Sequence, residues 1–182
     1  MIFFNLFPVI ETKNLLLRRM THEDKNDIFQ MRKDPRMHEY MDSKPDESVE
    51  ETEVYIDRMV NGIAANKWII WAIEHKVSKK VIGSISIWNI DKEKGVAELA
   101  YGIIPDYQGK GLMKEALLSA VGYGFNVMKL KSLDAYTEEK NIRSIKLLDS
   151  CKFKVVDKVD DQGYCNDRIY HMVVYRLENT IQ

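Results

Sequence analysis

The sequence predicts an α/β (α+β) protein, with a single mixed, mostly antiparallel twisted sheet of about six or seven strands and helices on both faces. Residues 68–74 and 81–88 are rich in Ile, Val and Trp and are separated by a polar stretch, which is typical of a hairpin. After residues 96–104 the pattern changes to strand and helix in alternation. Because no repeat and no Pro-, Gly- or Ser-rich linker divides the chain, we expect residues 1–182 to form one domain.

The N-terminal third supplies one strand and two helices. Residues 14–19 are expected to form the strand. Thr21 then opens T-H-E-D, an N-cap residue followed by acidic residues, which predicts a helix over 24–33 that ends at Pro35. A second helix is predicted over 48–63, where a serine and two glutamates form the start signal. Both helices therefore precede most of the sheet.

The rest of the chain supplies the remaining strands and the helices that cover them. Residues 96–104 follow the turn D-K-E-K-G and continue the antiparallel meander. Beyond them, the predicted helices are 112–128 and 141–151, and the predicted strands are 132–136, 153–159 and 169–177. The last two strands are expected to pair with each other.

Composition and charge exclude several classes of function. The formal net charge is -1, from 27 basic and 28 acidic side chains, and no long block of Lys or Arg is present, so we expect no nucleic-acid partner. The longest apolar stretches, such as 68–73, are far too short to cross a bilayer, and residues 1–7 lack the features of a secretory signal. We therefore expect a cytoplasmic protein without a membrane partner, and a homodimer is compatible with the sequence.

Metal binding has no support in the residue pattern. Cys151 and Cys165 form no C-x-x-C pair, so neither a zinc site nor a disulfide framework is indicated. The histidines lie on different predicted elements without the spacing of metal ligands; they are His22, His38, His75 and His171. The sequence therefore predicts no metal cofactor.

The most informative segment, residues 98–115, reads as a strand, a glycine loop and a helix. Gly109 and Gly111 would let the backbone approach a ligand without a Cβ atom, and the free amides of the following helix N-terminus favour a phosphate or pyrophosphate. Lys110 would add a mobile positive charge. A tight turn without a ligand is the alternative interpretation. The spacing fits neither the nucleotide P-loop nor the dinucleotide loop G-x-G-x-x-G, whose third glycine is replaced by Lys114.

Residues 108–113, Q-G-K-G-L-M, resemble the Q/R-x-x-G-x-G/A signature with which GNAT acetyltransferases bind the pyrophosphate of acetyl-CoA. Gln108 and Gly111 match the signature, whereas Met113 stands where Gly or Ala is usual. The similarity extends through E-T-K-N-L-L-L-R-R, V-I-G-S-I-S, E-L-A-Y-G-I and N-x-x-S-x-x-L-L. These segments are similar to the branch that contains the ribosomal-protein N-terminal acetyltransferases, with Lys152 replacing the usual glycine of a Gly-Phe pair.

The resemblance implies a GNAT-like fold with acetyl-CoA as the acyl donor. In that family the strand before the loop and the strand after its helix splay apart, and the pantetheine arm lies between them, bonded to main-chain amides. Amides near Gly102 and Ile103 would then polarise the thioester carbonyl, as an oxyanion hole does. The residues that the resemblance assigns to the cofactor are Tyr101, Gly102, Ile103, Ile104, Gln108, Gly109, Lys110, Gly111, Leu112, Met113 and Asn141.

Two residues are candidates for proton transfer. An amine is mostly protonated at neutral pH, so its proton must leave before the nitrogen can attack. Glu98 lies on the strand that leads to the splay and is our preferred base, directly or through water; a solvated Glu in a cross-strand charge pair is the alternative. Asp106 and Asp134 rank lower. By resemblance, Ser144 protonates the departing thiolate, although Asn141 and Ser144 also suit an N-capped helix start.

Taken with the resemblance, these residues predict an N-acetyltransferase that moves the acetyl group of acetyl-CoA to a primary amine by direct attack on the thioester. The acceptor is either a protein N-terminus or a small-molecule amine, and the sequence does not choose between them. A non-catalytic acyl-CoA-binding sensor or regulatory module is the alternative function.

Overall fold

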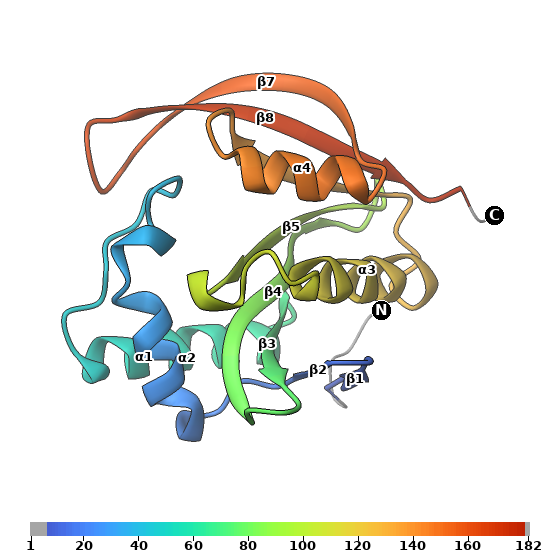
Figure 1. The fold of residues 1–182 in the computed structure, drawn as a ribbon. Helices are drawn as coiled ribbons and strands as arrows, with labels where there is room; N and C mark the ends of the chain where they lie inside the picture. The colour runs from blue at the N-terminus through green and yellow to red at the C-terminus, as the bar shows by residue number, and fades with distance from the viewer. Residues whose placement is uncertain (1–6, 181–182) are drawn as a thin grey trace.

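The computed structural model describes residues 7–180 and has the expected architecture, a mostly antiparallel sheet with helices on both faces (Figure 1). Within these residues the sheet has eight strands, in the order β1-β2-β3-β4-β5-β6-β8-β7. The strands are β1 Ile10–Glu11, β2 Leu15–Arg18, β3 Ile69–His75, β4 Lys80–Asp91, β5 Val96–Ile103, β6 Ser132–Glu138, β7 Lys154–Gln162 and β8 Ile169–Glu178. The count exceeds the expected six or seven because the two-residue β1 is too short to show an alternating pattern.

The helices lie close to where the sequence places them. The α-helices are α1 Lys25–Arg32, α2 Val49–Ala64, α3 Leu112–Asn126 and α4 Ile142–Ser150, and the 3-10 turns are η1 His22–Asp24, η2 Pro35–Met37 and η3 Pro105–Tyr107. Thr21 caps η1, so the first helix begins with a 3-10 turn. Ser48 caps α2 by accepting a hydrogen bond from the Glu51 amide at 3.3 Å. In the described part of the chain, no helix is long and apolar enough to cross a membrane.

Helices α3 and α4 lie on one face of the sheet, and η1, α1 and η2 lie on the other (Figure 1). On the first face, Trp71 packs against Tyr123 of α3 with 5.3 Å between the ring centroids. Tyr101 stands in the same cross-strand row as Trp71. Because successive residues of a strand point to opposite faces, Gly102 points to the second face, where a Cβ atom would lie 3.1 Å from Met37 of η2. The two faces therefore have different neighbours at the end of β5.

Strands β5 and β6 form a parallel pair over only part of their length. Their pairing ends with Leu99 opposite Ala135. Beyond that point β5 stays with β4 as far as Ile103, and β6 stays with β8 as far as Glu138. A gap therefore opens between the carboxyl ends of β5 and β6, with α3 and α4 on one side of it.

Strand β7 is one edge of the sheet, opposite β1, and all of its residues are exposed. It pairs with β8 alone, and a bulge interrupts this pairing between Val155 and Asp157. Its sequence, K-V-V-D-K-V-D-D-Q, carries charges of both signs. The hairpin of β7 and β8 extends past the end of β6 (Figure 1).

The turn from α4 into β7 retains a left-handed residue although its sequence lacks a glycine. Lys152 has φ 71°, in the left-handed region. The Phe153 amide donates to Leu148 O at 3.1 Å and the Lys152 amide donates to Asp149 O at 3.0 Å, which is the hydrogen-bond pattern of a Schellman C-cap. Phe153 and Leu148 are both buried. Packing of this pair therefore keeps a lysine in a conformation that costs about 1 kcal/mol.

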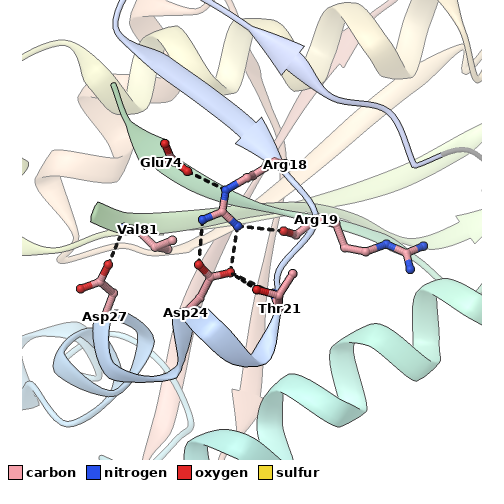
Figure 2. Close-up of polar contacts among 7 residues, drawn as sticks. All are labelled: Arg18, Arg19, Thr21, Asp24, Asp27, Glu74 and Val81. Atoms are coloured by element: carbon pink, nitrogen blue, oxygen red, sulfur yellow. Dashed lines mark hydrogen bonds and ion pairs between the residues drawn. The ribbon is translucent and has the colours of Figure 1, made fainter. Parts of the chain in front are cut away.

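A guanidinium group ties the start of α1 to the sheet (Figure 2). Arg18 of β2 donates to the two carboxylate oxygens of Asp24 at 2.9 and 2.7 Å and to Glu74 of β3 at 2.6 Å. Asp24 also accepts from the Thr21 amide at 2.9 Å. Burial alone would raise the pKa of the Asp24 carboxyl, but the hydrogen bonds from Arg18 and Thr21 hold this pKa below its ordinary value. The network joins β2, β3 and η1 in one polar cluster.

We expect Arg18→Met to lower the free energy of unfolding at pH 7 by about 3 kcal/mol or more, because it leaves two largely buried carboxylates without their cation. The folded-state pKa of Asp24 is lowered, so its stabilising contribution is present above the ordinary carboxyl pKa and is lost as the pH falls through the folded value. Urea unfolding of parent and variant should therefore show a difference that shrinks in acid. Arg36→Met, which removes an exposed ion pair with Asp34, is the control and should change stability by less than about 1 kcal/mol. An Arg18→Met effect as small as that of the control would contradict this role.

Candidate active site

The separation of β5 from β6 exposes main-chain groups of β5. The Ile104 amide donates to Ile82 O of β4 at 2.9 Å, whereas the Ile103 carbonyl accepts from the Gln108 side chain at 3.0 Å. Neighbouring residues of a strand direct their N–H and C=O groups alternately to its two sides. The amides of Tyr101 and Ile103 therefore face the gap, and these two are better placed than their neighbours to bind a ligand there.

The glycine loop has a backbone that glycine adopts without strain. Gly109 and Gly111 have φ 74° and 79°, in the left-handed region. No atom lies within 4 Å of the place where a Cβ atom would stand at either residue, so the backbone angle rather than crowding requires glycine. Gly111 is the N-cap residue of α3. The first amides of α3 lack partners within the helix and stand at the positive end of its dipole, which suits an anion.

Leu112 and Met113 begin α3 but direct their side chains into the protein. Leu112 is 6% exposed, and Met113 packs against the hydrophobic core. Only their main-chain amides are therefore available to a ligand. Met113 occupies the position where the family signature has a small residue, and here it serves packing. Lys110 extends over the ring of Tyr107, with its Nζ atom 5.0 Å from the ring centroid.

Gln108 is bonded at both ends of its side-chain amide. Nε2 donates to Ile103 O at 3.0 Å, and Oε1 accepts from Nη1 of Arg143 at 2.9 Å. Arg143 lies on α4, which follows β6, so this contact joins the two sides of the gap. Arg143 is not among the site residues predicted from the sequence, and the one available signal was its position two residues after Asn141 in N-x-x-S.

The start of α4 brings a second pair of polar groups to the gap. Asn141 is the N-cap of α4 and accepts from the Ser144 amide at 3.2 Å, so its capping role is confirmed. Ser144 is 8% exposed, and its Oγ atom lies 2.8 Å from the Tyr101 hydroxyl. Burial raises the pKa of Tyr101 to about 12, although the Ser144 hydrogen bond acts in the opposite direction. Tyr101 therefore remains protonated at neutral pH, beside Ser144.

Glu98 lies on the opposite face of the sheet, just before β5 and β6 separate. It stands between Trp88 of β4 and Asp134 of β6. Its half-buried carboxylate accepts a hydrogen bond from Asn89. Burial raises the pKa of Glu98; the Asn89 hydrogen bond opposes this shift, and the nearby Asp134 charge adds to it. The cross-strand neighbour of Glu98 on β6 is therefore another acid, Asp134. Asp134, and not Glu98, forms the ion pair with Arg176, at 2.6 Å.

The other chemically reactive side chains near the gap have structural roles. The Arg176 contact engages Asp134, and Asp106 lies in the first turn of η3. Cys151 is buried in the hydrophobic core. Within residues 7–180 no group of three or more His, Cys, Asp or Glu side chains could hold a metal ion.

The face that carries Glu98 is bordered by two loops that touch each other. Asp42 lies in the connection between η2 and α2, and its carboxylate accepts a hydrogen bond from the Tyr164 amide in the β7–β8 turn. Arg168 donates to Glu39 O at 2.9 Å and lies 3.8 Å from the buried Glu138 carboxylate on β6. These contacts join the connection between α1 and α2 to the β7–β8 hairpin beyond the open end of the gap.

A family model described as "Acetyltransferase (GNAT) domain" matches residues 14–154. The chain belongs to the GNAT acetyltransferase family. "Uncharacterized N-acetyltransferase p20" of Bacillus licheniformis is 31% identical over 91% of this GNAT chain and 93% of its own length. Spermidine N(1)-acetyltransferase of Vibrio cholerae is 22% identical over 85% of this chain and 87% of its own length. The relatives thus group this chain with GNAT N-acetyltransferases.

Solved GNAT structures share the fold over almost the whole chain. Spermidine N-acetyltransferase from Vibrio cholerae, in complex with CoA and spermine, has a TM-score of 0.78 and 22% identity over 92% of this chain and 96% of its own. The ribosomal-protein-S5-alanine acetyltransferase from Vibrio fischeri has a TM-score of 0.83 and 20% identity over 95% of this chain and 97% of its own. At these identities the likeness shows the GNAT fold alone.

We expect Gly111→Asp to lose most affinity for CoA, because an acidic side chain beside the α3 N-terminus would repel a pyrophosphate. Gly111→Ala is the control for backbone strain, since alanine adopts the left-handed region no more readily than aspartate and carries no charge. Isothermal titration calorimetry should give at least about a tenfold weaker CoA affinity for the aspartate than for the alanine variant. Equal affinities in two folded variants would place the anion elsewhere.

Proposed function

We propose that this GNAT protein transfers the acetyl group of acetyl-CoA to a primary amine, which attacks the thioester directly. The proposal depends on the gap that opens between β5 and β6 beside the N-terminus of α3. The gap has the glycine loop and the N-terminus of α3 at one end and main-chain donors along one wall, and a carboxylate stands on the opposite face of the sheet. A module that only sensed acyl-CoA would have no need of that carboxylate, so the arrangement favours an enzyme.

The residues around the gap fit acetyl-CoA. Main-chain amides at the start of α3, with the charge of Lys110, would hold the pyrophosphate at Gly109 and Gly111. The amides of Tyr101 and Ile103 would bind the pantetheine arm and the thioester carbonyl. Negative charge develops on that carbonyl oxygen when the amine attacks, and fixed donors stabilise it.

Glu98 is the proposed base for the acceptor nitrogen. An ammonium group must lose a proton before its lone pair can attack, and a carboxylate with a raised pKa accepts that proton more readily near neutral pH. Glu98 lies on the face away from α3 and α4, so the amine would approach the thioester from the side opposite the loop. The amine and acetyl-CoA would thus come together from different faces of the sheet.

Ser144 is the proposed proton donor to the leaving group. When the carbon–sulfur bond breaks, its electron pair stays on the CoA sulfur as a thiolate, which then takes a proton. The Ser144 hydroxyl stands at the gap on the α4 side, and the Tyr101 hydroxyl 2.8 Å away supports it as a neutral hydrogen-bond partner. This pair would protonate the thiolate, so that it leaves as a thiol, and would regain its proton from water; the attacking nitrogen would lose its second proton to water as the amide forms.

The proposed acceptor is a primary amine, of a small molecule or of a protein N-terminus. Trp88, opposite Glu98, is 42% exposed, and Tyr136 on β6 is 43% exposed, so aromatic surface flanks the proposed base. Aromatic rings beside a carboxylate suit a cationic amine. The relatives named for spermidine and for a ribosomal protein both support an amine acceptor and do not separate the two classes.

A turnover screen tests the proposed function. Acetyl-CoA would be incubated with polyamines, amino acids, aminoglycosides and peptides with different first residues, and thiol release would be measured. The proposal expects release that depends on an acceptor. Tight CoA binding without acceptor-dependent turnover would identify the sensor instead.

We expect Glu98→Gln to keep CoA affinity and to lower turnover at neutral pH by about a hundredfold or more, the usual scale for loss of a general base. Raising the pH should restore part of the activity, because a growing fraction of the amine is then already unprotonated and needs no base from the enzyme. Turnover across a pH series, with circular dichroism to verify folding, makes this measurement. A parental pH–rate profile in a folded variant would eliminate Glu98 as the base.

Asn89→Ala provides a matched test of the same role without removing the carboxylate. The Asn89 hydrogen bond lowers the pKa of Glu98, so its loss should raise that pKa further. Activity that needs ionised Glu98 rises as the pH passes this pKa, and the acid limb of kcat/KM should therefore move to higher pH in Asn89→Ala. A purely structural Glu98 would leave the acid limb in place.

We expect Ser144→Ala to slow turnover more than it weakens CoA binding, because the hydroxyl acts when the carbon–sulfur bond breaks. The Tyr101 hydroxyl would lose its partner, so Tyr101→Phe should give a comparable loss that is not additive with Ser144→Ala. Single-turnover rates, measured where chemistry limits, test both variants. Unchanged rates would leave Ser144 as a helix-start residue only.

A further inference from the structure

The side-chain amide of Gln108 orients Arg143. Its Nε2 group is bonded to the Ile103 carbonyl at 3.0 Å, which fixes the side chain against the end of β5. Its Oε1 atom accepts from Nη1 of Arg143 at 2.9 Å. Gln108 occupies the first position of the loop signature, where the family has either Gln or Arg. In this chain that position carries the neutral Gln108, and the positive charge beside it belongs to Arg143 of α4.

Arg143 has hydrogen-bonding capacity left for a ligand. A guanidinium carries five N–H donors in a planar fork, and the contact with Gln108 engages Nη1. Arg143 is exposed, and it immediately precedes the buried Ser144 at the edge of the gap. Its backbone belongs to the β6 side, whereas its head group reaches the loop on the β5 side. The charge therefore lies where the two sides of the gap meet the glycine loop.

The lysines near the loop are held differently. Lys110 lies over the Tyr107 ring, and the Nζ atom of Lys114 donates to Ser150 O at 3.3 Å. Lysine is a point charge on a flexible stem, whereas a guanidinium oriented by a neighbouring amide can bind two phosphate oxygens at once. Arg143 is thus the cation best oriented for a phosphate group at this loop.

We propose that Arg143, oriented by Gln108, binds the pyrophosphate of CoA together with the amides at the start of α3. This inference rests on the proposed use of CoA as the acyl donor. The amides approach the anion from the β5 side and Arg143 approaches it from the β6 side. Because Ser144 follows Arg143 on the same helical turn, binding of the pyrophosphate also fixes the end of α4 that carries the proposed proton donor.

Calorimetry with CoA, dephospho-CoA and pantetheine tests the proposal. In Arg143→Ala, the affinities for CoA and dephospho-CoA should both fall by about tenfold or more, as for loss of a charge-assisted hydrogen bond. Pantetheine has no phosphate, so its affinity, measured by competition if it is weak, should not change. Arg143→Lys should recover only part of the loss. Lys146→Ala removes one positive charge from another exposed position of α4 and should have little effect.

Four results would overturn the proposal. CoA affinity within about twofold of the parent in Arg143→Ala would show that Arg143 takes no part. An equal loss with pantetheine would indicate a general change in the gap. A loss confined to CoA and absent with dephospho-CoA would move Arg143 to the 3′-phosphate, and an equal loss in Lys146→Ala would reduce the effect to net charge. A parent protein that binds no CoA would refute the proposed function instead.

Substitution of Gln108 tests the orienting role separately. In Gln108→Glu a carboxylate would compete with the pyrophosphate for Arg143, so CoA should bind more weakly than to Gln108→Leu, which only removes the contact. The difference between these two variants should become smaller when Arg143→Ala is added to each, leaving only the direct repulsion between the glutamate and the pyrophosphate. Persistence of the full difference in the double variants would show that Gln108 acts without Arg143.

Discussion

Strands β5 and β6 stay paired only as far as Leu99 and Ala135, and beyond these residues each strand keeps only the pairing with its other neighbour. β4 holds β5 up to its end, and β8 holds β6 up to Glu138. From there on each strand follows its own neighbour, and the two ends do not pair again. The gap is therefore a property of the whole sheet, and the candidate site depends on strand pairings at a distance from it.

This gap divides the candidate chemistry between two faces. On the side of α3 and α4 stand the glycine loop and the Ser144 and Tyr101 hydroxyls. On the other side stands Glu98, in a row with Trp88 and Asp134. An acetyl donor and an amine acceptor that entered from opposite faces, as proposed, would meet only where the strands part, and no large moving domain would be needed to place them.

Local patterns in the sequence predicted most elements of the fold, because alternation, helix caps and the glycine loop each depend on neighbouring residues. The contacts that organise the site are different in kind. Ser144 and Tyr101 are 43 residues apart, and the partners Arg143 and Gln108 are 35 apart. No periodicity marks which polar side chains meet across elements, so Arg143 went unnoticed and Tyr101 was assigned only a main-chain role. Whether Glu98 had a cation beside it was likewise decided by the register of β5 and β6.

The exposed edge strand has a consequence for the solution behaviour of the protein. A strand that is unpaired along one side offers a template to any other extended chain, and an edge of apolar residues would promote aggregation. β7 counters this with lysines and aspartates along the edge and with a bulge that interrupts its regular geometry. Adding a further strand would bring these charges out of water and would have to match an irregular backbone. The edge of the long hairpin beside the candidate acceptor surface is therefore a poor template for a strand of another chain.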